Sequence, residues 1–231
     1  MDHAGAAWAF AEQGATIYLH PFGKKHMADP SKLLISAKRI YKERMFELWG
    51  DLKPIAETQL KVVEHAAIHK IGGVSIQAWH TPGHAVHHIA WQIGKQLIAG
   101  DVAGVSIEGG MVVPPCPPPD INIEDWLASI KLIRGLDIEA IYLTHFGKIT
   151  AINEHLDALE HILWDWANWI KPYWEDKADP KKVTPLFMKY TADQLRSSGA
   201  NELQVQQYEA ANPSWMSVAG LMRYWRKKEE V

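Results

Sequence analysis

Apolar and polar positions alternate in two different ways along this chain. Up to about residue 150, short apolar runs end at glycine, proline or other turn residues, a pattern typical of strands with intervening helices. From residue 153 onward, apolar positions recur at a helical spacing. The pattern favours the α/β class, with a β-rich region over residues 1–150 and a helical C-terminal extension over residues 151–231.

The β-rich region is expected to open with helices and to continue as a series of strands. Helices are predicted over residues 6–13, 29–50 and 122–135; Asp29 and Asn122 would cap the last two. Strands are predicted over residues 16–19, 61–63, 67–70, 74–79, 88–92, 96–99 and 140–144. Residues 112–119 hold five prolines, which predicts a stiff surface loop, since proline has no backbone N–H to donate.

The extension is expected to form helices over residues 153–169, 185–197, 202–211 and 214–228. It carries six of the eleven tryptophans. Because so many large apolar rings do not suit a solvated appendage, we expect the extension to pack on the first region within a single domain overall. Core packing is the favoured role of Trp164, Trp166 and Trp169, with an apolar wall over a site or a dimer face as alternatives.

Composition places the chain among ordinary globular proteins. A net charge of −3 over 231 residues does not indicate a basic surface for nucleic acid, and no apolar run reaches the length of a membrane-spanning helix. Cys116 is the one cysteine, so no disulfide can form within the chain, which fits a reducing compartment. We expect a cytoplasmic protein without nucleic-acid or membrane partners, in which Cys116 is an inert loop thiol; a homo-oligomer stays open.

The most informative stretch is residues 80–88, which hold four of the twelve histidines around a Pro-Gly turn. A predicted strand leads into this turn and another leaves it, which would place imidazoles at the rim of a sheet, where sites tend to lie. Asp101, His145 and the pair Asp2-His3 share this kind of placement in loops at the ends of predicted elements. Neutral imidazoles and carboxylates are ligands of zinc, iron and manganese, so these residues are candidate metal ligands.

These segments resemble, in order, the metal-binding motifs of the metallo-β-lactamase superfamily of binuclear hydrolases. They are Asp2-His3-Ala4-Gly5, the turn at His84, Gly100-Asp101 and Thr144-His145. The resemblance covers about residues 1–150 and implies an αββα sandwich with the metals along one edge of its two sheets. By position, His84 would bind the first metal and Asp101 would bridge both. Asp2, His3 and His145 would bind the second, and Asp2 would also act in catalysis by orienting the attacking water.

The chain departs from the family at its first motif, His-x-His-x-Asp-His. Only the last three positions are present, with Met1 before Asp2 and His3, and the strands that precede this motif in the family are absent. We therefore expect an N-terminally truncated sandwich with a weak first metal site, an occupied or half-occupied second site and an open sheet edge that invites pairing. Without the resemblance, Asp2 would be read as a helix cap.

The resemblance implies a metal-dependent hydrolase with two zinc ions, or with iron or manganese in their place. Metal coordination lowers the pKa of water to roughly 7, and the resulting hydroxide would attack an ester, thioester, lactone or amide in a small-molecule substrate. The abundance of tryptophan favours an uncharged or lipophilic substrate, and no basic cluster favours a glutathione thioester. The competing hypothesis is a catalytically impaired fragment, or a non-enzymatic partner-binding module that retains one metal.

The candidate ligands also have simpler interpretations. His84 would otherwise be an ordinary loop histidine, and Asp101 would be a turn residue that follows glycine. No metal role is expected for the other histidines of the stretch: His80 would be structural, and His87 and His88 would lie on the surface or face a substrate groove.

Overall fold

A computed structural model describes residues 3–230, apart from the side chains of residues 40 and 41. The chain divides into two compact units, Met1–Ala67 and Ile68–Val231. The division lies earlier than the change from β-rich to helical sequence near residue 150. In the described part of the chain, no helix is long and apolar enough to cross a membrane.

The first unit contains short helices around a pair of parallel strands. Its elements are α1 (Ala7–Glu12), β1 (Ile17–Leu19), α2 (Pro21–Ala28), α3 (Ser31–Tyr41), α4 (Met45–Trp49) and β2 (Leu60–Val62), with 3₁₀ turns at Lys42–Arg44 and Glu57–Gln59. Ala11, Ile55 and Leu60 form its small core. The helix expected over residues 29–50 is broken at Lys42, whose φ of 47° lies outside the helical range.

Helix α2 was not predicted from the sequence. Pro21 suggested the end of an element, but it occupies the first turn of the helix, where its fixed φ fits and its missing N–H costs nothing. The Nδ1 atom of His20 accepts a hydrogen bond from the Phe22 N–H and so caps the helix. His20, for which no role was predicted, is therefore a capping residue.

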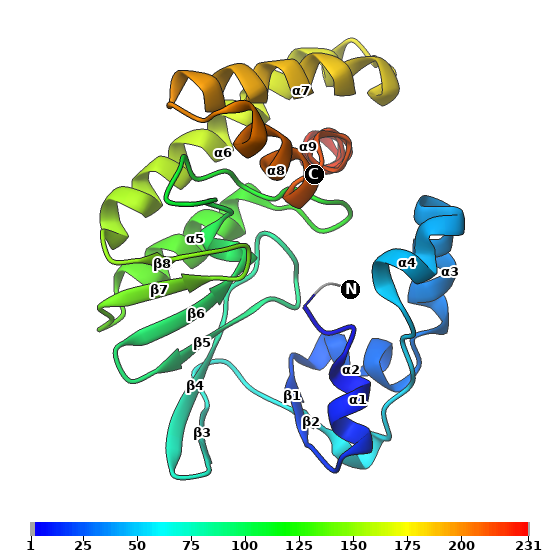
Figure 1. The fold of residues 1–231 in the computed structure, drawn as a ribbon, viewed down its shortest axis with the longest axis vertical. Coiled ribbons are helices and arrows are strands. Elements are labelled where there is room, and N and C mark those ends of the chain that lie inside the picture. The colour runs from blue at the N-terminus through cyan, green and yellow to red at the C-terminus, as the bar shows by residue number, and fades with distance from the viewer. Residues whose placement is uncertain (1–2, 231) are drawn as a thin grey trace. The chain divides into compact units, whose positions relative to one another are not determined.

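The second unit is built on a six-stranded sheet whose strands lie side by side in chain order (Figure 1). The strands are β3 (Ile68–Ile71), β4 (Val74–His80), β5 (Ile89–Ile93), β6 (Gln96–Gly100), β7 (Ala140–Leu143) and β8 (Lys148–Ile149). All neighbouring pairs are antiparallel except β6 and β7, which are parallel because helix α5 (Ile123–Arg134) connects them. As a result, β4, β6 and β7 run in the same direction and end at the same edge of the sheet.

Apolar side chains on one face of the sheet form the core together with the helices. Leu97 and Ile141 are aligned on adjacent strands, and both are fully buried in a cluster that includes Trp126 and Ile130 of α5. The side chain of Asn122 accepts a hydrogen bond from the Asp125 N–H at the start of α5, as its predicted capping role requires.

The helical extension belongs to the core of the second unit. It comprises α6 (Ile152–Glu175), α7 (Pro180–Ser197), α8 (Glu202–Ala211) and α9 (Ser214–Glu229). Trp166 of α6 is buried and donates to the Gln194 side chain of α7, while Trp225 of α9 donates to the Ala167 carbonyl of α6. Trp169 stacks on Tyr190 at a centroid distance of 5.1 Å. These contacts assign Trp166 and Trp169 to packing between the helices.

The proline-rich segment is buried over its first five residues, so the expectation of a surface loop was wrong there and holds only for residues 118 and 119, which are exposed. Residues 112–116 are buried, and Val113 forms an isolated antiparallel bridge with Val105. The Asn212 side chain donates to the Pro114 carbonyl. Helix α9 lies directly against the segment at Gly220, where a Cβ atom would come within 2.0 Å of the Cys116 carbonyl oxygen. Outside the bridge at Val113, proline suits this buried segment because it has no backbone N–H that would need a hydrogen-bond partner.

We predict that the Cys116 thiol is unreactive in the folded protein. The residue is fully buried, and burial raises the pKa of its thiol because the thiolate would lose its hydration. Ellman's reagent should therefore label no thiol in native buffer and one thiol per chain in denaturant. Rapid labelling of the native protein at the rate of a small free thiol would contradict the buried position of residues 112–116.

Candidate metal centre

The turn that carries His84 is anchored to the first turn of α5. Gly83 has a φ of 128°, and a Cβ atom at this position would lie 2.3 Å from the Cα of Trp126. The Gly83 carbonyl accepts a hydrogen bond from the Asn122 N–H, and the Ser129 hydroxyl donates to the Pro82 carbonyl. The Pro-Gly sequence therefore fixes the chain against a helix, and His84 follows this fixed point directly.

Asp101 and His145 leave the sheet at the same edge because β6 and β7 are parallel. Gly100 is aligned with Leu143, so the residues that follow each strand lie next to one another. Asp101 begins a 3₁₀ turn, Asp101–Ala103, and is only 6% exposed. Since β4 ends at this edge as well, the sheet topology brings His84 to the same place.

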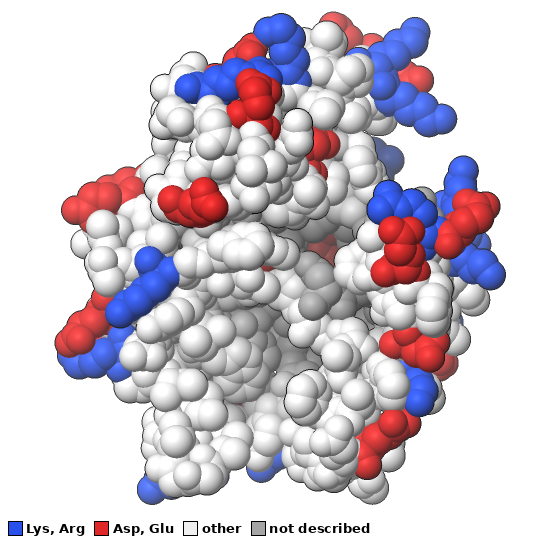
Figure 2. Space-filling model, in the orientation of Figure 1, with Lys and Arg blue, Asp and Glu red and all other residues white. Residues whose placement is uncertain are grey.

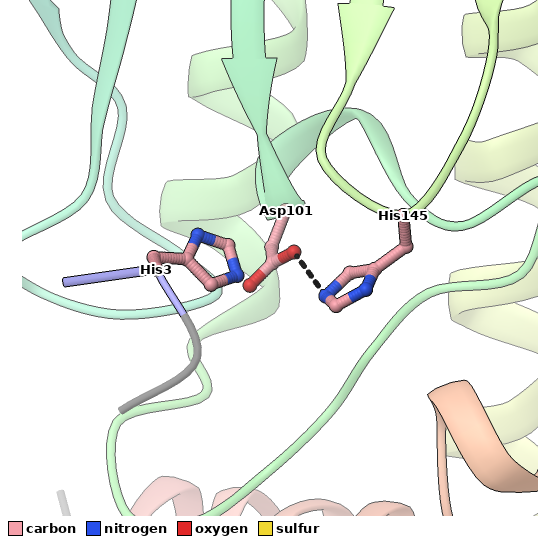
Figure 3. Close-up of side chains that lie close together, drawn as sticks. All are labelled: His3, Asp101 and His145. Atoms are coloured by element: carbon pink, nitrogen blue, oxygen red, sulfur yellow. Dashed lines mark ion pairs between the residues drawn. The ribbon is translucent and has the colours of Figure 1, made fainter. Parts of the chain in front are cut away.

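Two imidazoles face the two oxygens of the Asp101 carboxylate. The Nε2 atom of His84 lies 3.1 Å from Oδ2. The Nε2 atom of His145 lies 3.2 Å from Oδ1, as the dashed line in Figure 3 marks. The Nδ1 atom of His84 lies 2.8 Å from the Pro115 carbonyl oxygen. A carbonyl can only accept, so Nδ1 carries the proton, and in the neutral ring Nε2 keeps a lone pair directed at the carboxylate.

These residues fit a metal ion. Zinc binds imidazole nitrogen and carboxylate oxygen at about 2.0–2.2 Å, so two ligands of one ion at the tetrahedral angle are separated by about 3.3–3.6 Å. The two N···O distances, 3.1 and 3.2 Å, are slightly shorter, so small side-chain movements would admit an ion. The Nδ1 atom of His84, on the side of the ring away from Asp101, is also hydrogen-bonded to a backbone carbonyl, as is usual for metal-binding histidines.

The structure brings together three of the five predicted ligands, His84, Asp101 and His145. Their role in metal binding stays a prediction. His3 belongs to the first unit, and its role as a ligand also stays a prediction. Asp2, the predicted ligand and catalytic residue, lies outside the described residues.

His88 contributes to this site in a way that the sequence did not indicate. Its Nε2 atom accepts a hydrogen bond from the Asp101 backbone N–H at 3.1 Å, and its Nδ1 atom lies 2.8 Å from the Thr81 hydroxyl. The side chain is therefore directed inward, to the backbone of a predicted ligand. The available signal was glycine before Asp101: at Gly100 a Cβ atom would come within 2.4 Å of the His88 ring.

Two further side chains fix the turn that begins at Asp101. Trp126 donates from its indole N–H to the Val102 carbonyl at 2.7 Å, and His155 donates from Nε2 to the Ala103 carbonyl at 2.8 Å. The backbone of three consecutive residues is thus hydrogen-bonded to three separate aromatic rings. The turn is held from several elements of the second unit, which restricts where the Asp101 carboxylate can point.

We predict that His155 makes stability depend on pH. Burial lowers its pKa below the ordinary value of 6.5, and this effect outweighs the hydrogen bond to Ala103, which raises it. The unfolded chain therefore binds the proton more readily. The stability from neutral His155 is complete above about pH 6.5 and is lost as the pH falls through the lowered pKa of the folded state.

His155→Gln keeps a donor near the Nε2 position but does not titrate, so its unfolding free energy should decline less between pH 7.5 and 5.5. Urea unfolding of metal-free protein measures this difference. His161→Gln, an exposed change on the same helix, is the control. Equal pH dependence in the two variants would show that His155 does not contribute.

Comparison with known proteins gives a consistent family assignment. The sequence profile of the metallo-beta-lactamase superfamily matches residues 1–145. The metallo-beta-lactamase fold-containing protein ST1585 of Sulfurisphaera tokodaii is 29% identical over 127 residues, which are 54% of this chain and 48% of that protein. This chain thus spans about half the length of the curated relative that it matches.

Two solved structures show the similarity of fold. The crystal structure of ST1585, from Sulfolobus tokodaii, matches with a TM-score of 0.57 and 24% identity over 66% of this chain and 61% of that one. The metallo-beta-lactamase family protein TTHA1429 from Thermus thermophilus matches with a TM-score of 0.63 and 18% identity over 98% of this chain and 71% of that one. The α/β fold is confirmed together with its helical C-terminal region. The chain belongs to the metallo-beta-lactamase superfamily.

Proposed function

We propose that this chain provides ligands for a catalytic metal centre and acts as a metal-dependent hydrolase. The observation that carries the proposal is the approach of His84 and His145 to opposite oxygens of one buried carboxylate, Asp101. Membership of a superfamily of hydrolytic metalloenzymes supports it. Zinc is the proposed metal, as two ions in the complete centre, and iron or manganese are the alternatives.

The side chains of the centre have separate tasks in this proposal. His84, Asp101 and His145 would hold the metal, which would supply a nucleophilic hydroxide near neutral pH and polarise the oxygen of the scissile group. Asp101 provides the negative charge that compensates a cation, with one oxygen toward each imidazole. Pro115 keeps His84 in the tautomer whose Nε2 atom can bind. His145 approaches from the other side of the carboxylate.

We further propose that the substrate is a small, uncharged or lipophilic ester, thioester, lactone or amide. Phe146, next to His145, is 61% exposed and has a φ of 80°. A bulky residue is rarely found in this conformation, and such strain is most often kept near functional sites. Its position supports an apolar contact for the substrate beside the centre.

Nucleic acid is not the proposed substrate. Over α7, at the upper edge of the view in Figure 2, basic and acidic side chains lie next to one another. They include pairs such as Lys189 with Asp193 and Arg196 with Glu202, so opposite charges compensate locally. This arrangement lacks the one-signed surface that binding to a phosphate backbone requires.

The proposal is tested by hydrolysis of nitrophenyl esters, aryl thioesters and a simple lactone before and after metal removal. We expect turnover by zinc-loaded protein, loss of turnover with chelator, and recovery when zinc is added back. Turnover that persists without metal would contradict the proposal. Tight metal binding without turnover would favour the alternative, a partner-binding module that retains a metal.

A further inference from the structure

We propose that His88 is a positioning residue that fixes the Asp101 carboxylate for metal binding without contacting the metal. The proposal rests on the proposed function. The Nε2 atom of His88 accepts a hydrogen bond from the backbone N–H of Asp101 itself. Any displacement of this N–H shifts the Cα of Asp101, and with it both carboxylate oxygens that face His84 and His145.

The protonation of His88 follows from its partners. The Asp101 N–H can only donate, so Nε2 of His88 must be unprotonated. The single proton of the neutral ring is then on Nδ1, which donates to the Thr81 hydroxyl at 2.8 Å. Both ring nitrogens are engaged, one as acceptor and one as donor. Neither nitrogen is left to coordinate a metal, which separates the role of His88 from that of His84.

The backbone around His88 is itself fixed. The Thr81 N–H donates to the His88 carbonyl at 3.1 Å, which continues the antiparallel pairing of β4 with β5. Thr81 is fully buried and thus holds both the backbone and the ring of His88. The loop that carries His84 begins at Thr81 and ends at His88. The hydrogen bonds between these two residues therefore support both the His84 loop and the turn at Asp101.

Gly100 fits the same arrangement. The His88 ring lies so close that a Cβ atom on residue 100 would come within 2.4 Å of Nε2, and the φ of Gly100 is 63°. The glycine therefore gives the ring access to the N–H of the next residue. Gly100 and His88 thus act together: the glycine leaves space for the ring, and the ring provides the acceptor for the Asp101 N–H.

Zinc affinity separates positioning from a general structural role. His88→Leu removes the acceptor, whereas His88→Gln places an amide oxygen near the position of Nε2. Loss of an outer interaction of this kind typically costs 10–100-fold in metal affinity. We expect the zinc dissociation constant to rise at least about 10-fold in His88→Leu and less than about 3-fold in His88→Gln. His161→Leu, at an exposed histidine, should leave it unchanged.

Thr81 gives a second test that does not alter His88. Thr81→Val removes the partner of Nδ1 at nearly constant volume and should weaken zinc binding, while Thr81→Ser should restore it. Affinities are measured by competition with a chromophoric chelator, on variants whose metal-free circular dichroism matches that of the unaltered protein. If His88→Leu does not fold, the comparison of Thr81→Val with Thr81→Ser decides.

The two proposals fail in different ways. If the unaltered protein does not bind zinc through Asp101, the proposed function is wrong and the role of His88 falls with it. If the unaltered protein binds zinc but the folded His88→Leu or Thr81→Val variants bind equally well, only the positioning role is wrong. Equal weakening in His88→Gln and His88→Leu would also overturn it, because an acceptor near Nε2 would then be irrelevant.

Discussion

Asp101→Asn is expected to lower zinc affinity by more than about 100-fold, beyond the usual effect of losing an outer interaction. The asparagine side chain has no charge and only one oxygen. Its NH₂ group would face the Nε2 atom of either His84 or His145, where the carboxylate now presents an oxygen. A cation would then lose both its compensating charge and the bridge between the two imidazoles. Hydrolysis should fall in parallel.

The matched control for this variant is Asp137→Asn. Asp137 pairs with Lys95, and its side chain is 83% exposed, so loss of its charge should not alter metal binding. Chelator competition gives the affinities, and elemental analysis gives the metal content per chain. Wild-type affinity in Asp101→Asn would exclude this carboxylate from the centre.

Gly83→Ala is expected to destabilise the second unit by about 2–6 kcal/mol, because backbone strain and overpacking each cost about 1–3 kcal/mol. Its Cβ atom would lie within 2.5 Å of three Trp126 atoms, two of them in the backbone of α5. No side-chain rotation relieves such a clash, so the turn must separate from the helix. The hydrogen bond from Asn122 to Gly83 would weaken, and His84 would move.

Urea unfolding of metal-free protein measures this effect. Gly109→Ala is the control, since Gly109 also has a positive φ, 73°, but a Cβ atom there would meet nothing within 4 Å. We expect a loss of about 1–2 kcal/mol in the control from backbone strain alone. If the two variants are equally stable, the turn is not packed on α5 as described.

The sequence predicted those features whose causes are local. Asn122 and Gly135 mark the ends of α5, and residues 202–211 form a helix with the predicted bounds, because caps and stops act within one turn. The positions of strands β3 to β7 along the chain agree with the predicted runs to within one residue, since alternation and turn residues are also local signals.

The features that were missed depend on contacts between distant residues. Burial of the segment around Cys116 requires Gly220, more than a hundred positions later, and nothing near Cys116 in the sequence indicates it. His88 was expected on the surface or at a groove. Its partner could not be recognised from the sequence, because that partner is the backbone N–H of Asp101, a group that every non-proline residue has. The candidate ligands, in contrast, were found through residue types with known metal chemistry.

Anomalous diffraction from zinc-loaded crystals, recorded on both sides of the zinc absorption edge, would locate zinc bound by Asp101 and its two histidines. We expect a peak about 2.0–2.2 Å from an Asp101 carboxylate oxygen and from the Nε2 atom of His84 or His145. A peak that lies only at other residues, or no peak at saturating zinc, would contradict the proposed metal centre.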